Sequence, residues 1–159
     1  MAEHHGPDRP DPRRAAAVDD AAPALLSAWD AARERMIPRL SGPQLNALLA
    51  IEREPGVNLR GLAGHLKMIL SSASRLCDRL VASGMVERVP GRADRREIAL
   101  YLTPPARELL ERLRTTRREL LAEVLERMTP AGRAALERGL TEFADVADPE
   151  SPDAAARTA

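Results

Sequence analysis

Arginine and serine side chains gather in two short stretches of the chain. The first stretch holds Ser71, Ser72, Ser74, Arg75 and Arg79, and the second holds Arg88, Arg92, Asp94, Arg95 and Arg96. A planar guanidinium can donate paired hydrogen bonds to phosphate or to the edge of guanine, and a serine hydroxyl adds a small donor or acceptor. These residue types and their spacing indicate binding to a phosphate-rich partner.

The charge of the chain is concentrated in this region. The 159 residues have a formal net charge of zero, which excludes a protein that coats nucleic acid over its whole surface. Between residues 60 and 96, however, eight basic side chains stand against three acidic ones. A basic module within a neutral chain is typical of a protein that binds a polyanion with one face only.

Other chemistry is poorly represented. The chain has no glycine-rich phosphate loop, no histidine and carboxylate set with metal-ligand spacing, and no paired nucleophile and base, so we predict neither an enzyme nor a cofactor or metal site. The single cysteine, Cys77, excludes an internal disulfide and fits a reducing compartment. No window is apolar enough for a membrane span, and we expect a cytoplasmic protein.

The sequence patterns predict a mainly α-helical fold with one small β-hairpin. We expect a disordered arm over residues 1–22, a single domain over 23–147 and a disordered tail over 148–159, because both ends lack large apolar side chains. Apolar residues at spacings of three and four predict helices over 23–37, from Ser41 to about residue 53, and over 59–67. Residues 71–83 form the next expected helix, ended by Gly84.

The expected helix over 71–83 has two different faces. At 100° per residue, Ala73, Leu76, Cys77, Leu80 and Val81 fall on one side, which should pack against the preceding helix. The opposite side carries a hydroxyl, two arginines and little bulk, which is suitable for a groove (Ser71, Arg75, Asp78, Arg79 and Ala82). Two strands, 85–89 and 98–102, should follow as a hairpin with a charged tip.

Long amphipathic helices are expected to flank this module. Thr103 and Thr129 are each followed by proline, which predicts helix starts, and leucines recur through 109–128 and 136–140. Together with the first helix, these apolar stripes exceed what a small helix-turn-helix core can cover. We therefore expect residues 23–40 and 104–147 to form a helical dimerisation region, with 41–103 as a winged helix-turn-helix lobe.

The segment 41–110 resembles the multiple antibiotic resistance regulator (MarR) family of bacterial transcription factors. The resemblance lies in an ordered set of short motifs: Leu62-Ala63-x-x-Leu66, the run from Ser71 to Leu80, Gly84-Met85-Val86-Glu87-Arg88, Asp94-Arg95-Arg96 and Leu102-Thr103. The chain departs from the family pattern at Lys67, in a turn that often holds glycine, and at Ala106, where glycine usually follows the Leu-Thr motif.

The resemblance implies a homodimer that binds double-stranded DNA at a pseudo-palindromic operator, with a repressor as the expected regulator. It assigns Ser71, Ser72, Ser74 and Arg75 to the recognition helix, and it assigns Asp94 and Arg96 to a wing pair in which the acid orients the arginine toward the minor groove. Charge alone adds Arg79, Arg88, Arg92 and Arg95 as candidate DNA contacts. Family members often bind phenolic or lipophilic acids, and Trp29, Met36 and Leu40 could line such an effector pocket.

Four alternatives stay open. The same fold could activate transcription, or its basic patch could dock an acidic protein partner. Arg79 could pair with Asp78 or Glu87 instead of binding DNA. Cys77 could sense oxidants, but its place on the apolar side of the helix favours a buried thiol that acts as a small hydrophobe.

Overall fold

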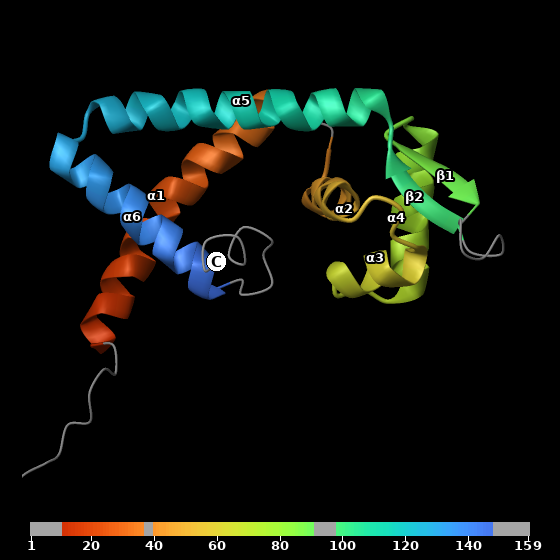
Figure 1. The fold of residues 1–159 in the computed structure, drawn as a ribbon, viewed down its shortest axis with the longest axis horizontal. Helices are drawn as coiled ribbons and strands as arrows, with labels where there is room; N and C mark the ends of the chain where they lie inside the picture. The colour runs from red at the N-terminus through yellow and green to blue at the C-terminus, as the bar shows by residue number, and fades with distance from the viewer. Residues whose placement is uncertain (1–10, 37–39, 91–97, 148–159) are drawn as a thin grey trace, which may run out of the picture. The chain divides into compact units, whose positions relative to one another are not determined.

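The computed structural model describes residues 11–36, 40–90 and 98–147, and its architecture is mainly α-helical with one β-hairpin (Figure 1). The elements follow in the order α1 (Pro12–Met36), α2 (Gly42–Arg53), α3 (Leu59–His65), α4 (Leu70–Ala82), β1 (Val86–Pro90), β2 (Ile98–Leu102), α5 (Pro104–Glu126) and α6 (Pro130–Ala147). The expected winged helix-turn-helix order is confirmed. The chain divides into two compact units, Met1–Arg117 and Arg118–Ala159, which are described separately.

Helix α1 begins earlier than the sequence patterns predicted. We expected a helix start near Pro23 after a disordered arm, whereas α1 begins at Pro12 and Pro23 lies inside it. Asp11 supports this start, because its carboxylate accepts a hydrogen bond from the Arg13 N–H (3.0 Å) and its carbonyl accepts one from the Arg14 N–H (2.8 Å). The stretch that follows is rich in alanine, the residue with the highest helix propensity, and this offsets the low hydrophobicity that suggested disorder.

The helix-turn-helix core is built from capped helices around one apolar centre. Ser41 caps α2 in a capping box: its hydroxyl accepts from the Gln44 N–H (3.4 Å), and the Gln44 side chain accepts from the Ser41 N–H (2.9 Å). Asn58 caps α3 by accepting from the Gly61 N–H (2.8 Å). The largest fully buried side chains come from α2, α3, α4, β2 and α5: Leu48, Ile51, Leu62, Leu76, Leu80, Leu100, Leu110 and Leu113.

The hairpin is tied to the helices by backbone hydrogen bonds. Strands β1 and β2 are antiparallel, with Val86 opposite Leu102 and Pro90 opposite Ile98. The segment before α3 pairs with β2, since the Gly56 N–H donates to the Leu100 carbonyl (2.9 Å) and the Leu100 N–H donates to the Val57 carbonyl (3.0 Å). The base of the wing is therefore fixed to the same core that holds α3 and α4.

Thr103 joins the end of the hairpin to the start of α5. Its hydroxyl donates to the Gly84 carbonyl (2.7 Å) and accepts from the Ala106 N–H (3.4 Å), while its own N–H donates to the Met85 carbonyl (3.1 Å). Ala106 is fully buried at this corner, and α5 begins regularly at Pro104 with alanine in the position where the family usually has glycine.

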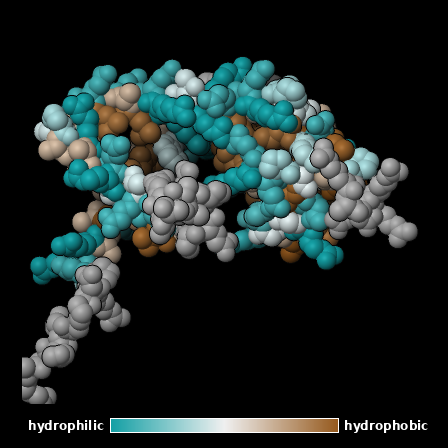
Figure 2. All heavy atoms as spheres, in the orientation of Figure 1, coloured by the Kyte–Doolittle hydropathy of each residue, from teal (hydrophilic) through white to brown (hydrophobic). Residues whose placement is uncertain are grey.

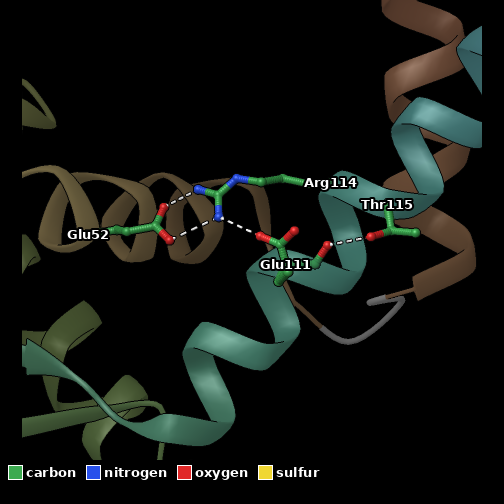
Figure 3. A network of polar contacts seen from close by, with 4 residues as sticks. All are labelled: Glu52, Glu111, Arg114 and Thr115. Carbon is green, nitrogen blue, oxygen red and sulfur yellow. Dashed lines mark hydrogen bonds and ion pairs between the residues drawn. The ribbon is translucent and has the colours of Figure 1, made fainter. Parts of the chain in front are cut away.

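A charged cluster connects α5 to α2 within the first unit. Figure 3 shows Arg114 of α5 reaching the carboxylate of Glu52 on α2 with both terminal nitrogens, while Glu111 of α5 accepts from the same guanidinium (3.4 Å). The Glu52 hydrogen bond raises the pKa of Arg114. One turn further along α5, Arg117 stacks over the Trp29 ring of α1 (5.0 Å to the centroid), and burial lowers the pKa of this arginine.

The second unit contains the last part of α5 and the whole of α6. Thr129 caps α6 as expected, because its hydroxyl accepts from the Gly132 N–H (3.1 Å). None of the described residues of α6 is buried, although the helix carries large apolar side chains. Its exposed set consists of Leu136, Leu140, Phe143 and Val146.

Candidate nucleic-acid interface

Helix α4 has the two faces that the sequence predicted. Ala73, Leu76, Cys77 and Leu80 are buried, and they fix the helix on the core. The opposite face is open to solvent along its length, with Ser71, Arg75, Asp78, Arg79 and Ala82 all exposed. Ser72 and Ser74 are half-buried between the two faces. The structure therefore brings the predicted residues of this helix together on one accessible surface.

The acidic residue on α4 does not neutralise the arginines of the same helix. The Asp78 carboxylate accepts a hydrogen bond from the Arg88 guanidinium of β1 (2.6 Å), which raises the pKa of Arg88. Arg75 and Arg79 make no ion pair or hydrogen bond with the described parts of the chain. The alternative in which Asp78 pairs with Arg79 is wrong, because the Asp78 carboxylate accepts from the Arg88 guanidinium of β1 instead.

This pairing changes the role that Arg88 can have. Its side chain is about one-third exposed (35%) and bonded to Asp78, so it links β1 to α4. A phosphate contact from Arg88 would have to share the guanidinium with Asp78. Arg79 is the more available cation of the two.

The turn between α3 and α4 is made without glycine. Lys67 adopts a left-handed backbone conformation (φ 50°), and it is the one non-glycine residue with positive φ among the described residues. The Lys67 N–H donates to the Gly64 carbonyl (3.0 Å), and the Met68 N–H donates to the Ala63 carbonyl (2.9 Å), so the end of α3 is closed as a glycine would close it. Gly84 ends α4 with φ 71°, as predicted.

Replacing Lys67 with glycine should stabilise the fold. A left-handed conformation costs an L-residue about 1–2 kcal/mol, and glycine avoids most of this while losing more chain entropy. We expect K67G to unfold in urea with a free energy about 1 kcal/mol higher than K67A, since both variants lose the charge but only glycine relieves the backbone. Equal stability of the two variants would contradict a strained turn.

The start of α4 carries a feature that the sequence analysis missed. Ile69 occupies the N-cap position, where no side chain accepts a hydrogen bond from the first turn. Ile69 is 71% exposed and the next residue, Leu70, is 48% exposed. The signal was visible in the sequence as two large apolar residues directly before the serines, in a position where Ser, Thr, Asn or Asp is usual.

Four of the predicted contacts fall outside the described residues. Arg92, Asp94, Arg95 and Arg96 belong to residues 91–97, between the two strands. Their assignment to a wing therefore remains a prediction from the sequence.

Comparison with known proteins agrees with this geometry. Residues 40–97 match the model of the MarR family. The winged-helix region is therefore similar to that of the MarR family. The chain is 28% identical over 101 residues to YsmB of Bacillus subtilis, described as an uncharacterized HTH-type transcriptional regulator, and the match covers 64% of this chain and 69% of YsmB.

Solved structures extend the likeness beyond the MarR-family model. RV1404 from Mycobacterium tuberculosis is 27% identical and superposes with a TM-score of 0.79, covering 89% of this chain and 97% of RV1404. MarR from E. coli is 22% identical with a TM-score of 0.61, covering 79% of this chain and 96% of MarR, and this likeness shows the fold. The chain is therefore a DNA-binding transcriptional regulator, because MarR-family members are regulators rather than enzymes.

The effector pocket suggested from the sequence remains a prediction, because part of it lies outside the described residues. Trp29 is 43% exposed beneath Arg117, Leu40 is half-buried, and the side chain of Met36 lies outside the described residues. A cavity of about 270 Å³ lies between α2, β2 and α5. Its lining is mixed in polarity: Ile51, Glu52, Pro55, Tyr101, Leu102, Arg107, Glu111 and Arg114.

The remaining reactive side chains have ordinary environments. Cys77 is a free and fully buried thiol among the apolar side chains of α4, as predicted from its place on the helix. His65 is exposed and pairs with Glu54 (2.7 Å). No helix within the described ranges has the length and apolar character needed to cross a membrane.

Proposed function

We propose that the chain is a homodimeric cytoplasmic repressor that occludes a promoter by binding a pseudo-palindromic operator. The observation that supports this most directly is the exposed face of α4, where Arg75 and Arg79 have no partner in the described chain while the opposite face is locked into the core. A rigid helix with available guanidinium groups on its outer side suits insertion into a major groove.

The proposed contacts divide by what each side chain can recognise. Arg75, one turn inside α4, can pair with a guanine edge, and the serines at positions 71, 72 and 74 leave room for close approach. Arg79 and the wing arginines at positions 92 and 95 would bind phosphate, while Asp94 would orient Arg96 toward the minor groove. Arg88 would act mainly through its bond to Asp78, by setting the angle of the wing.

The proposed dimer rests on the apolar face of α6. Leu136, Leu140 and Phe143 follow one another at spacings of four and three, which places them on a single side of the helix, and each is exposed. Exposed stripes of this kind are unusual on monomers and are typical of interfaces between subunits. Two protomers are also what a two-fold operator requires.

We also propose that a small lipophilic or phenolic acid releases the repressor. BpsR of Bordetella bronchiseptica, which has the same fold (20% identical, TM-score 0.55), is described as regulated in its DNA binding by 6-hydroxynicotinic acid. In this chain two locations compete for such a ligand: the surface near Trp29, Met36 and Leu40, and the cavity beside Tyr101 and Arg107. The second offers an exposed arginine and a phenol to a carboxylate.

A binding titration on the DNA upstream of the chain's own gene tests the proposal. The purified protein should bind one fragment at least 1,000-fold more tightly than a scrambled duplex of the same length, and the affinity should fall steeply between 50 and 200 mM salt. Protection mapping should show two half-sites about one helical turn apart. Equal binding to both duplexes would instead favour a module that docks an acidic protein.

A transcription assay separates the repressor from the activator of the same fold. Added to a template with the protected fragment and polymerase, a repressor lowers the yield of transcript, while an activator raises it. An increase would contradict the occlusion model but leave the DNA-binding assignment intact.

A further inference from the structure

The apolar pair at the start of α4 is unfavourable for folding by local criteria. Ile69 takes a position where Ser, Thr, Asn or Asp would satisfy a backbone N–H of the first turn, and no such bond is made. Ile69 and Leu70 both project into solvent, with 71% and 48% of their surface exposed. A single exposed apolar residue is common, but two in succession at an uncapped helix start add no packing to the described core.

These residues lie at the end of α4 that a recognition helix presents to bases. In helix-turn-helix proteins the N-terminal residues of this helix contact base edges in the major groove. Here that end consists of Ile69, Leu70 and Ser71, followed one turn later by Arg75. In Figure 2, hydrophobic atoms reach the surface among hydrophilic ones in the region of α3 and α4.

The chemistry of the major groove offers one apolar partner. Guanine, cytosine and adenine present hydrogen-bond donors and acceptors there, and only thymine presents a methyl group. Ile69 and Leu70 have no hydrogen-bonding side chain, so they gain nothing from the other three bases. Cations on the same helix, Arg75 and Arg79, favour a polyanionic partner over an apolar protein surface at this place.

We propose that Ile69 and Leu70 determine specificity by packing against thymine methyl groups, so that the operator half-site has thymine next to the base read by Arg75. This inference rests on the proposed function, because it requires α4 to enter the major groove. It assigns to this chain a preference for thymine that the serines and Arg75 do not provide.

The test removes the methyl group and nothing else. The probe is the duplex selected by the wild-type protein from a random pool, prepared with deoxyuridine in place of each thymine of one half-site in turn. At a contacted position we expect affinity to fall about fourfold, the value of one buried methyl group. In I69A, or in L70A for its own thymine, the same replacement should have no further effect.

Two further variants separate recognition from folding. I69S supplies the missing cap, so its Tm should rise by about 2–4 °C while its preference for thymine over deoxyuridine disappears. V18A, which shortens another exposed apolar residue, on α1, should keep the wild-type preference. A gain in stability together with a loss of discrimination is a result that a merely structural role for Ile69 does not give.

The possible failures are distinguishable. If the wild-type protein selects no sequence at all from the pool, the proposed function fails and this inference fails with it. If it selects a sequence but binds the thymine and deoxyuridine probes equally, the inference alone is overturned. The inference is also overturned if I69A and L70A lose as much affinity as the wild-type protein when thymine is replaced by deoxyuridine. It is likewise overturned if neither variant alters DNA binding, as expected when the pair docks a protein instead.

Discussion

Replacing Phe143 with aspartate is expected to produce a monomer that no longer binds the operator at concentrations where the wild-type protein is saturated. Phe143 is 66% exposed on α6, on the same side as Leu136 and Leu140. In the proposed dimer this side is buried, and an unpaired carboxylate placed there costs several kcal/mol. Because two linked half-site contacts strengthen each other, a monomer should bind at least 100-fold more weakly.

The matched control places the same charge elsewhere on α6. Thr141 is also exposed, and it lies about 200° around the helix from Phe143, so T141D should stay dimeric and keep its affinity. Sedimentation gives the mass of each variant and a gel shift gives its affinity. A dimeric F143D with unchanged binding would exclude α6 as the interface and would leave its apolar face to another partner.

Removing Arg75 should cost most of the sequence discrimination contributed by α4. Its guanidinium is exposed and has no partner in the described residues, so no internal ion pair is lost with it. A bidentate contact to guanine is worth about 1–3 kcal/mol against a wrong base, so R75A should lower the ratio of operator to random-DNA affinity about 5- to 150-fold. Titrations on both duplexes at one salt concentration measure this ratio.

Variants of two other arginines serve as controls for R75A. R79A should weaken binding to both duplexes alike and reduce the salt dependence by about one counterion, as expected for a phosphate contact. R112A removes an exposed arginine of α5 and should change neither value. Equal losses on operator and random DNA for R75A would reassign Arg75 from a base to the phosphate backbone.

The sequence predicts most of the helix-turn-helix core because its signals are local. The apolar period over 73–80 predicts the buried side of α4, Gly84 predicts its end, and the Ser41 and Thr103 positions predict two helix starts that the structure confirms. Each of these depends on residues within one or two turns, where side-chain spacing and backbone preference determine the outcome.

Features that depend on distant residues could not be read in this way. The Arg88–Asp78 pair depends on how the hairpin folds back on α4, and the Arg114–Glu52 bond joins residues that are far apart in sequence. The early start of α1 reflects helix propensity in a segment whose polarity suggested disorder. The exposure of Ile69 depends on how the start of α4 packs, and its apolar side chain gives no hydrogen-bonding signal in the sequence.

The turn at Lys67 has a consequence for covalent modification. Lys67 is the sole lysine among 24 basic residues of the chain, and it is exposed directly before the recognition helix. Acylation of lysine side chains can therefore occur at one place only, and it would cancel a positive charge close to the bound duplex without altering an arginine. Acylation of Lys67 would therefore weaken DNA binding by the loss of one positive charge per chain.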